Sequence, residues 1–397
     1  MEDYQEQEYE FFRKLDDTMD RRRLLKRGIA AGAGLTILSL PESALAIRQR
    51  ITAAAPPLHG KDVSMKEMIA NARKEGHVNL IALPPDWSNY GEMLKTWTKK
   101  FGISYTDDNP NGSSAQENQA IVSLKGDPRA PDCVDVGPSF AVQGANTGLY
   151  AKYFPTTYKT IPRGMKDTRG FWNGDYYGVI SIGSSGNLVK NAPKTFKDLL
   201  KPEYKNQVAL NGSPLTSNSA VAGVLAASIA NGGSLGDVGP GIDFFAQLNK
   251  IGNFIPVQGT PQTVATGQTP IVIDWNYLNI AYAPEFPAVH WVTNIPPDGI
   301  YGGYYCQAVN SSAPHPWAAR LWQEFIYSDQ GQIIFLKGFA IPARFADLTA
   351  RKVIPASLLA KLPSPAVLAK VKFASLGQIT AAKAKIAAEW PSKVGTS

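Results

Sequence analysis

Residues 64–106, SMKEMIANARKEGHVNLIALPPDWSNYGEMLKTWTKKFGISYT, decide the fold class, because helical and strand patterns alternate along them. Ser64 and Glu67 form a capping box, in which each side chain satisfies a free backbone N–H group at the start of a helix. Gly76 is the residue type that ends such a helix, and residues 78–83 are almost all apolar, as in a strand covered on both faces. The alternation predicts an α/β fold in which each sheet is mostly parallel and flanked by helices.

The same alternation continues through the rest of the chain. Ser113 and Gln116 predict a helix that runs to Gly126, and residues 183–186, Gly-Ser-Ser-Gly, are expected to interrupt a strand. Further strands are expected at residues 103–106, 133–136, 176–182, 187–189, 207–210, 270–274 and 304–309, and helices after 195–198, at 220–231, from Pro316 onward and over much of 350–388. Parallel strands place their carboxyl ends at one edge of a sheet, and ligands bind at that edge.

Residues 1–46 have the three parts of an export signal. Residues 21–26, RRRLLK, resemble the twin-arginine consensus. Residues 28–40 are uncharged but too short and too rich in Gly and Ala to span a bilayer, and residues 44–46, Ala-Leu-Ala, fit the pattern that a signal peptidase cleaves. The segment predicts twin-arginine export to the periplasm, with a mature chain that begins at Ile47 and carries no lipid anchor. Met19 is an alternative start.

Composition limits the classes of protein that the mature chain can belong to. Removal of residues 1–46 takes away 7 of the 40 Lys and Arg and 9 of the 33 Asp and Glu, which leaves 33 and 24 and a formal charge of +9. These charges are scattered rather than gathered in a block, so nucleic-acid binding is not expected. About 350 residues exceed what one hydrophobic core serves, so two lobes are expected. Cys133 and Cys306 permit one disulfide in an oxidising compartment, and two buried free thiols are the alternative.

Three passages, taken in order, resemble the class II periplasmic solute-binding proteins of ABC importers. Residues 131–136, PDCVDV, with Gly-Leu-Tyr at 148–150, are similar to the family's passage before the first crossing between lobes. Residues 191–205, NAPKTFKDLLKPEYK, are similar to its Pro-x-Thr-Trp-x-Asp-Leu-Leu segment, and residues 313–332 look like a late family helix that ends in Ser-Asp-x-Gly-Gln. The resemblance covers about residues 60–345 and is strongest to the branches for iron(III), spermidine or putrescine, and phosphonates.

The resemblance implies a two-lobe clamp that closes on a solute and then meets an ABC permease in the inner membrane. It assigns residues 60–148 and 290–313 to lobe I, residues 149–289 and 314–345 to lobe II, and residues 346–397 to a helical tail packed on the outside. A monomer without a cofactor or a nucleic-acid partner is expected.

Candidate ligand-binding residues follow strands or start helices, because a cleft between two sheets is lined by those positions. They are Asp86, Trp87, Ser113, Ser114, Ser139, Tyr177, Ser184, Ser217, Asn218, Asp274, Trp275, Tyr277 and Tyr304. Neighbouring residues on a strand point to opposite faces, so at most one of Tyr304 and Tyr305 is expected to face the cleft.

Two kinds of solute fit these candidates. Serine-rich helix starts suit phosphate, phosphonate or carboxylate, because free N–H groups and the positive end of the helix dipole point at the ligand. Asp86 and Asp274, beside Trp87, Trp275 and Tyr277, would instead surround an amine with carboxylates and aromatic faces. Both alternatives stay open from the sequence.

Iron is disfavoured by the sequence. The iron-binding branch uses adjacent tyrosines in the second lobe, and the position that matches here has residues 274–277, Asp-Trp-Asn-Tyr, instead. The four histidines have no metal-binding spacing, so no metal site is expected.

An exported hydrolase is the alternative from another class. Residues 183–186 do not have the Gly-x-Ser-x-Gly spacing of a nucleophile elbow, and no phosphate-binding or dinucleotide motif occurs. We therefore expect reversible binding without turnover, and a ligand sensor with the same clamp is a further alternative.

Overall fold

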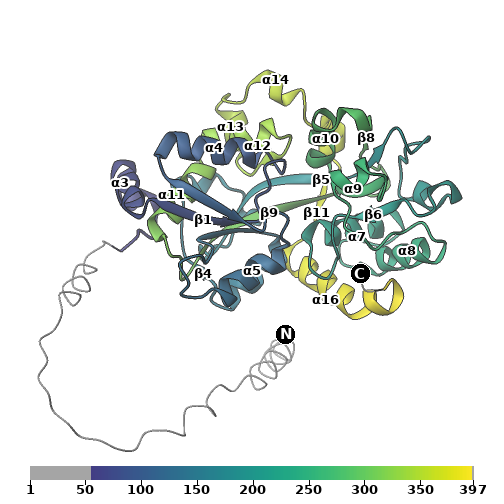
Figure 1. Ribbon diagram of the computed structural model, residues 1–397, viewed down its shortest axis with the longest axis horizontal. Helices are drawn as coiled ribbons and strands as arrows, with labels where there is room; N and C mark the ends of the chain where they lie inside the picture. Colours follow the sequence, from purple (N-terminus) through teal and green to yellow (C-terminus); the bar gives the residue numbers. More distant parts are fainter. Residues whose placement is uncertain (1–54, 396–397) are drawn as a thin grey trace, which may run out of the picture. The chain divides into compact units, whose positions relative to one another are not determined.

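The computed structural model describes residues 55–395, and all of these after residue 55 belong to the compact unit formed by residues 56–397 (Figure 1). The expected export signal lies outside the described residues. Within them, no helix combines the length and the apolar character needed to cross a membrane.

The chain begins this unit with the helix and strand order that the sequence predicts as far as Val136, and a helix and a short strand that were not predicted follow. The elements are α3 (Met65–Glu75), β1 (His77–Ile81), α4 (Tyr90–Phe101), β2 (Ser104–Asp108), α5 (Ser114–Ser123), β3 (Cys133–Val136), α6 (Pro138–Asn146) and β4 (Tyr150–Ala151). The Ser64 hydroxyl accepts a hydrogen bond from the Glu67 backbone N–H, and Gly76 ends α3 in the left-handed conformation at φ 72°. The N-cap at Ser64 and the C-cap at Gly76 are confirmed, although only the Ser64 half of the expected capping box forms, and the capping box at Ser113 is complete. Helix α5 ends before Gly126.

Two long antiparallel strands, β5 (Asn173–Ser185) and β9 (Tyr301–Asn310), form the centre of a nine-stranded sheet. Its main order is β11-β9-β5-β7-β6, with β3, β4, β8 and β10 paired at the flanks. The expectation of mostly parallel sheets is wrong for the strand pairing within the described residues. Six of the nine pairings are antiparallel, and only β1–β2, β6–β7 and β9–β11 are parallel. The reason is that β5 and β9 run antiparallel to each other, and that most of the shorter strands pair antiparallel with one of these two.

The expectation that residues 183–186 interrupt a strand is also wrong for residues 183–185. Strand β5 continues through Gly183 and ends at Ser185, and residues 187–189 form a turn instead of a new strand. A Cβ atom on Gly183 would lie 2.0 Å from the Asn279 Oδ1 atom. The glycine therefore serves the close packing of helix α10 on the strand, as a glycine inside a strand often does.

The middle of the chain builds a second group of elements around the far end of β5. It contains β6 (Val208–Leu210), α7 (Asn218–Ala230), α8 (Gly239–Lys250), α9 (Pro261–Ala265), β7 (Ile271–Trp275), α10 (Asn276–Glu285) and β8 (Trp291–Asn294). Strand β5 pairs with β9 and β10 over residues 173–179 and with β7 and β8 over residues 180–185. It therefore runs from one group of elements into the other. The helix expected after residues 195–198 is a short 3-10 helix, Lys197–Leu200.

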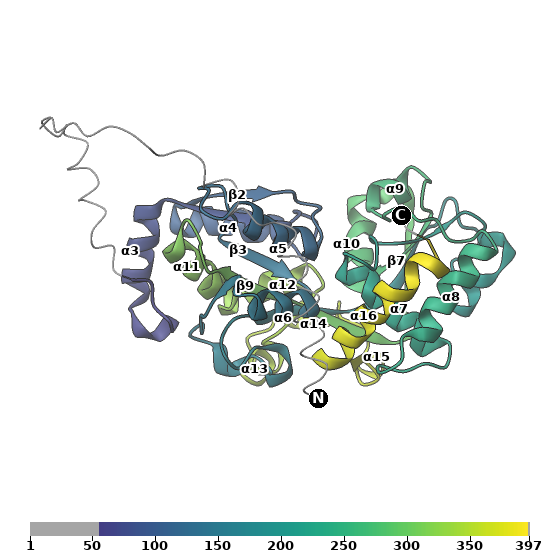
Figure 2. The same cartoon turned by 90° about the horizontal axis from the view of Figure 1, so that it is seen from below.

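We call the group with β1–β4, α3–α6 and α11–α13 the first lobe, and the group with β6–β8 and α7–α10 the second lobe (Figure 2). Helices α11 (Pro316–Ile326) and α12 (Asp329–Lys337) pack against α3 and α4. Residues 316–337 thus lie with the first lobe, whereas the sequence assigned them to the second. The tryptophan rings of Trp97 in α4 and Trp322 in α11 meet edge to face at 5.4 Å, which places them in the core of this lobe.

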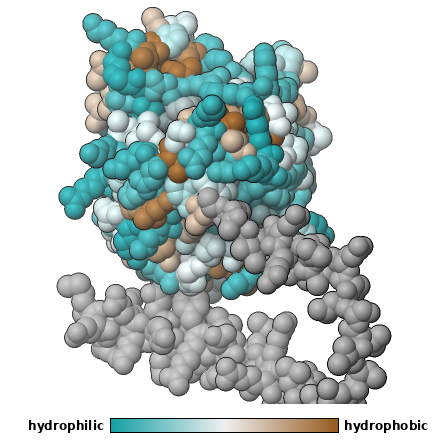
Figure 3. Space-filling view, turned by 90° about the vertical axis from the view of Figure 1, so that its left-hand side faces the viewer, coloured by the Kyte–Doolittle hydropathy of each residue, from teal (hydrophilic) through white to brown (hydrophobic). Residues whose placement is uncertain are grey.

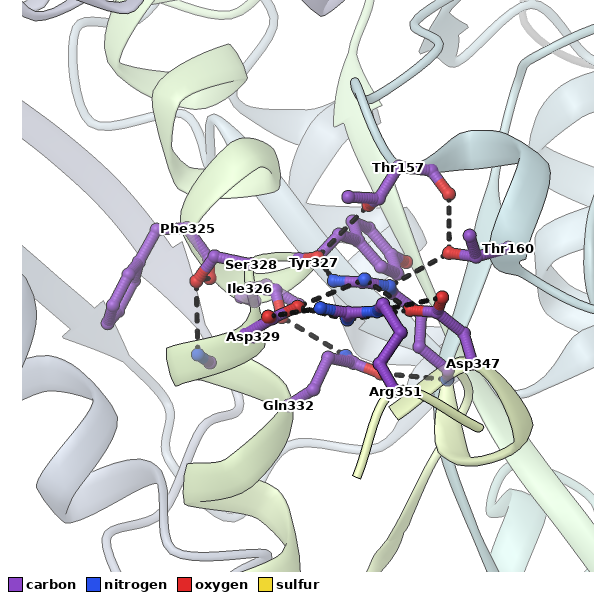
Figure 4. A network of polar contacts seen from close by, with 12 residues as sticks. Thr157, Thr160, Phe325, Ile326, Tyr327, Ser328, Asp329, Gln332, Asp347 and Arg351 are labelled. Carbon is purple, nitrogen blue, oxygen red and sulfur yellow. Dashed lines mark hydrogen bonds and ion pairs between the residues drawn. The ribbon is translucent and has the colours of Figure 1, made fainter. Parts of the chain in front are cut away.

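An ion-pair network joins the turn between α11 and α12 to α13 (Phe345–Ala350) (Figure 4). The buried Arg344 guanidinium lies 2.5 Å from Asp347 and 3.0 Å from Asp329, and it donates to the Tyr327 carbonyl at 2.6 Å. Arg351 pairs with the same two carboxylates. The buried Arg344 also donates to the Thr160 hydroxyl at 2.8 Å, so the network holds the turn, α13 and the segment around Thr160 together at one side of the first lobe.

The tail is only partly helical, with α14 (Ala356–Leu359), α15 (Pro365–Leu368), the short strand β11 (Lys372–Phe373) and the long helix α16 (Leu376–Lys393).

Cys133 and Cys306 are buried and free. The face in Figure 3, where grey atoms do not cover it, is mostly hydrophilic with small separate hydrophobic patches.

Candidate functional site

A cavity of about 680 Å³ lies between the lobes. Its first-lobe wall is the loop after β1, residues 110–112 and the start of α5. Its second-lobe wall is the loop after β6, the start of α7, residues 254–262 and the end of α10, and Tyr305 of β9 lies between the walls. Residues from the ends of strands and the starts of helices thus converge on one space, as expected for this edge of the sheets.

Six of the thirteen candidate residues line this cavity. They are Asp86, Trp87, Ser113, Ser114, Ser217 and Asn218. Asp86 and Trp87 come from the loop after β1, the two first-lobe serines from the start of α5, and the last two from the start of α7. Both lobes therefore contribute candidate residues to the same space.

Three further candidates lie directly behind the lining residues. Asp274 accepts a 2.7 Å hydrogen bond from the Asn211 side-chain amide, and Asn211 lines the cavity. The Trp275 indole N–H donates to the Ser219 hydroxyl at 3.0 Å, and Ser219 also lines the cavity. Tyr277 packs edge to face against Trp87, with ring centroids 6.2 Å apart. These side chains position lining residues instead of facing the cavity.

The remaining four candidates lie elsewhere. Tyr304 points to the opposite face of β9, where its hydroxyl donates to the Gly164 carbonyl, and its neighbour Tyr305 lines the cavity. Tyr177 packs against Phe373. Ser139 and Ser184 are buried outside the cavity lining. As the strand geometry requires, no more than one of the two adjacent tyrosines faces the cavity. It is Tyr305 instead of the candidate Tyr304.

Several lining residues were missed by the sequence analysis. They include Glu117, Asp135, Asn211, Gln258, Tyr282, Glu285 and Trp390. Glu285 is at the far end of α10, and Trp390 is on a tail helix that was expected to pack outside. No local signal marks either position, because each depends on where a whole helix is placed. Asp135 could have been predicted from the sequence, since it lies in the expected strand 133–136, which the candidate Ser139 follows.

Two carboxyl groups face the cavity from opposite lobes, Asp86 from the loop after β1 and Glu285 from the end of α10. Burial raises the pKa of Asp86. Burial, and then the negative charge of Asp86, raise the pKa of Glu285. The two groups are therefore close enough to repel each other, and Tyr282 lies near both. A positive charge between them would remove that repulsion.

Two more carboxyl groups lie at the inner end of the cavity. Glu117 accepts a 2.7 Å hydrogen bond from the Asp135 backbone N–H, and the Asp135 carboxylate accepts from the hydroxyls of Tyr90 and Tyr176 at 2.8 and 3.0 Å. Burial raises the pKa of Asp135 to about 7 and that of Glu117 well above its usual range. The inner end thus holds acidic groups with hydroxyl partners and no cation.

The lining of the cavity carries no positive side chain. Among the described residues that line it there is no Lys, Arg or His, although the chain as a whole has an excess of basic residues. Burial favours the protonated forms of Glu117 and Asp135, so the negative charge of the lining comes mainly from Asp86 and Glu285, and it is opposite in sign to that of the chain as a whole. This charge pattern favours a cationic or neutral solute over an anion.

The helix starts at the cavity already use their capping groups. Gln116 accepts from the Ser113 backbone N–H, and the Ser114 hydroxyl accepts from the Gly137 backbone N–H. The Ser217 hydroxyl donates to the Asn211 carbonyl and accepts from the Ala220 N–H. The hydroxyls of Ser113 and Ser217 already donate within the protein, so of these three serines only Ser114, whose hydroxyl accepts, offers a hydroxyl proton to an anion.

Aromatic side chains line the floor of the cavity. The Trp87 indole N–H donates to the Tyr176 hydroxyl at 2.7 Å, and the Trp87 ring meets Tyr305 edge to face at 5.7 Å. Tyr176 and Tyr305 stack with centroids 5.7 Å apart. Because these contacts fix Trp87 and Tyr305, their faces are held in place for a cation that enters the cavity.

The described residues contain no group of three or more His, Cys, Asp or Glu side chains arranged to hold a metal ion. The cavity carboxyls are spread over both lobes and the inner end.

The two-lobe α/β fold and the cavity between its lobes define a solute-binding protein of the periplasmic type. The family model for bacterial extracellular solute-binding proteins matches residues 131–366, and the chain belongs to this family. This membership confirms the expected role as the solute-binding component of an importer and does not favour the hydrolase. A search of curated proteins by sequence found no match.

Solved structures with the same fold include several periplasmic binding proteins. AfuA from Actinobacillus pleuropneumoniae, bound to fructose-6-phosphate, is 16% identical with a TM-score of 0.63, and the match covers 80% of this chain and 98% of AfuA. Iron-bound HitA from Pseudomonas aeruginosa is 19% identical with a TM-score of 0.59, covering 78% and 97%. An ABC transporter substrate-binding protein from Bradyrhizobium japonicum is 17% identical with a TM-score of 0.61, covering 79% and 99%. At these identities the likeness establishes the fold.

Proposed function

We propose that the protein captures a small organic cation with an ammonium group between its lobes and delivers it to an ABC permease in the inner membrane. One observation carries the proposal: Asp86, Glu117, Asp135 and Glu285 line the cavity, and no positive side chain among the described residues does. An organic cation is favoured over a metal ion because no metal-binding group of side chains accompanies the carboxyls.

Binding of an ammonium group at Asp86 and Glu285 would join the two lobes. Burial raises the pKa of Glu285 most, and the negative charge of Asp86 raises it further, so the two carboxylates oppose each other in the free protein. A cation between them replaces that repulsion with two attractions that exist only when the lobes are close together. The solute therefore shifts the population toward the closed clamp, which is the form that a permease would receive.

Trp87 and Tyr305 would add a second attraction for the same charge. Both rings line the cavity and are held by neighbouring aromatic residues. A cation over such a face gains roughly 1 kcal/mol, and more when water is excluded. The ring faces also cover the methylene groups of an amine, which an inorganic cation lacks.

We further infer that the protein binds its solute without turnover and is exported by the twin-arginine pathway. The support for export is the RRRLLK segment at residues 21–26 and the extracellular character of the family. Replacing Arg21 and Arg22 by Lys should stop export of the full chain, whereas the same change at Arg13 should not. Periplasmic recovery of the Arg21→Lys/Arg22→Lys variant would contradict this pathway.

A thermal-shift screen of residues 47–397 tests the solute class. The panel contains diamines and polyamines, phosphonates, dicarboxylates and ferric chelates. We expect the amines alone to raise the melting temperature, because a ligand that binds only the native state stabilises it by RT ln(1 + L/Kd), where L is the free ligand concentration. A rise with phosphonates or dicarboxylates and none with amines would contradict the proposal.

A further inference from the structure

Helix α16 lies across both lobes. Its buried face consists of Ile379, Ala382, Ile386 and Trp390, which recur at helical spacing. The helix packs against α6 of the first lobe and against α7 and α8 of the second. Figure 2 shows it, in yellow, running from the neighbourhood of α6 toward α7 and α8. The family match ends at residue 366, so α16 lies beyond the matched segment.

The first-lobe contact of α16 includes a lysine placed over an aromatic ring. The Lys383 ammonium lies 3.2 Å from the centroid of the Phe140 ring in α6. Burial lowers the pKa of Lys383 to about 8. The contact therefore holds the long side chain of Lys383 against the first lobe.

The second-lobe contact is at the other end of the helix. Trp390 packs against Phe245 and Phe254, with ring centroids 5.4 and 6.1 Å apart. The Lys393 ammonium pairs with Asp243 at 2.7 Å, and the Asn249 side chain donates to the Val394 carbonyl at 2.9 Å. Because Phe245, Asp243 and Asn249 all belong to α8, this end is attached to the second lobe.

The second-lobe end of α16 also reaches the cavity. Trp390 and Gly395 line it together with Phe254. One helix thus contacts the first lobe, the second lobe and the space in which the solute is held. A movement that separates the lobes must break one of its two attachments or bend it.

We propose that α16 is a strap that limits how far the lobes of the free protein open, and that its Trp390 end forms part of the cavity wall. Without the strap, the free protein opens further and the solute escapes faster. The strap acts in the absence of solute, so it is independent of the solute class proposed above.

The test compares the solute-free mature protein with a variant that ends at Ala374. Small-angle scattering should show a larger radius of gyration for the shortened protein. Hydrogen exchange should be at least threefold faster in the two cavity walls, residues 110–117 and 254–262. A folded variant with an unchanged radius and unchanged exchange would overturn the proposal.

Single substitutions decide the question if the shortened chain does not fold. Lys383→Ala loosens the first-lobe attachment and Lys393→Ala the second-lobe attachment, while Lys66→Ala on the exposed side of α3 is the control. Faster exchange in both cavity walls for both strap variants, and not for the control, supports the strap. Unchanged exchange in either variant overturns it, because a strap needs both ends.

Discussion

The replacement of Asp86 by Asn and of Glu285 by Gln is the most informative perturbation of the cavity. Each change keeps the size of the side chain and removes one of the two facing charges. At an effective dielectric constant of about 20, one charge pair at about 4 Å is worth roughly 4 kcal/mol. Desolvation offsets part of that gain, so we expect each variant to lose about 2 kcal/mol of binding, which is about 30-fold in Kd.

The same substitutions have the opposite effect on the free protein. Burial, and then the negative charge of Asp86, raise the pKa of Glu285, so removing either charge lowers the cost of the ligand-free state. The melting temperature without solute should therefore stay the same or rise, while the affinity falls. A residue with a merely structural role would lower both.

Isothermal titration with 1,4-diaminobutane measures the loss, with Glu67→Gln on the exposed helix α3 as a control of equal charge. We expect the double variant to lose less than the sum of the single losses, since both carboxyls bind one ammonium group. The affinity of the native protein should also fall as acidification protonates these carboxyls, which happens at higher pH than for ordinary ones. Unchanged affinity in both single variants would refute the role of the facing carboxyls.

Three further predictions concern the framework around the site. Arg344→Met should lower the free energy of unfolding by about 2 kcal/mol in urea denaturation, because it leaves two carboxylates without their buried partner, and Arg129→Met on an exposed pair should leave it unchanged. Gly183→Ala should cost about 1–3 kcal/mol in the same assay, because its Cβ would overlap Asn279, and a wild-type stability would contradict that packing. Burial raises the pKa of Asp274 to about 7, so its folded form holds a proton that the unfolded chain releases near pH 4, and the native protein loses stability as pH rises from 5 to 7. The Asp274→Asn variant should lose about 2 kcal/mol less of its free energy of unfolding between pH 5 and 7 than the native protein does. Identical pH profiles of unfolding free energy for the two proteins would show that Asp274 does not titrate in this range.

The sequence predicted the elements well wherever a signal is local. Ser64, Glu67 and Gly76 identify the bounds of α3 because capping depends only on residues within a few positions. The direction of strand pairing is not local. Residues 176–182 look like a strand in either direction, and only the pairing with β9 and β7 settles it.

Only part of the candidate site was predicted, because local signals mark some of its residues and not others. Asp86 and Ser217 follow strands or start helices, and both line the cavity. Asp274 lies near the end of strand β7, but its carboxyl accepts a hydrogen bond from Asn211 behind the lining. Glu285 and Trp390 reach the cavity only because helices α10 and α16 end there, which depends on tertiary packing.

The central claim is that the cavity selects a positive charge. Isothermal titration of residues 47–397 with 1,4-diaminobutane and with succinate tests it most directly, because the two compounds have the same chain length and opposite charges. The account predicts saturable binding of the diamine and no heat of binding for succinate. Saturable binding of succinate with none for the diamine would contradict it.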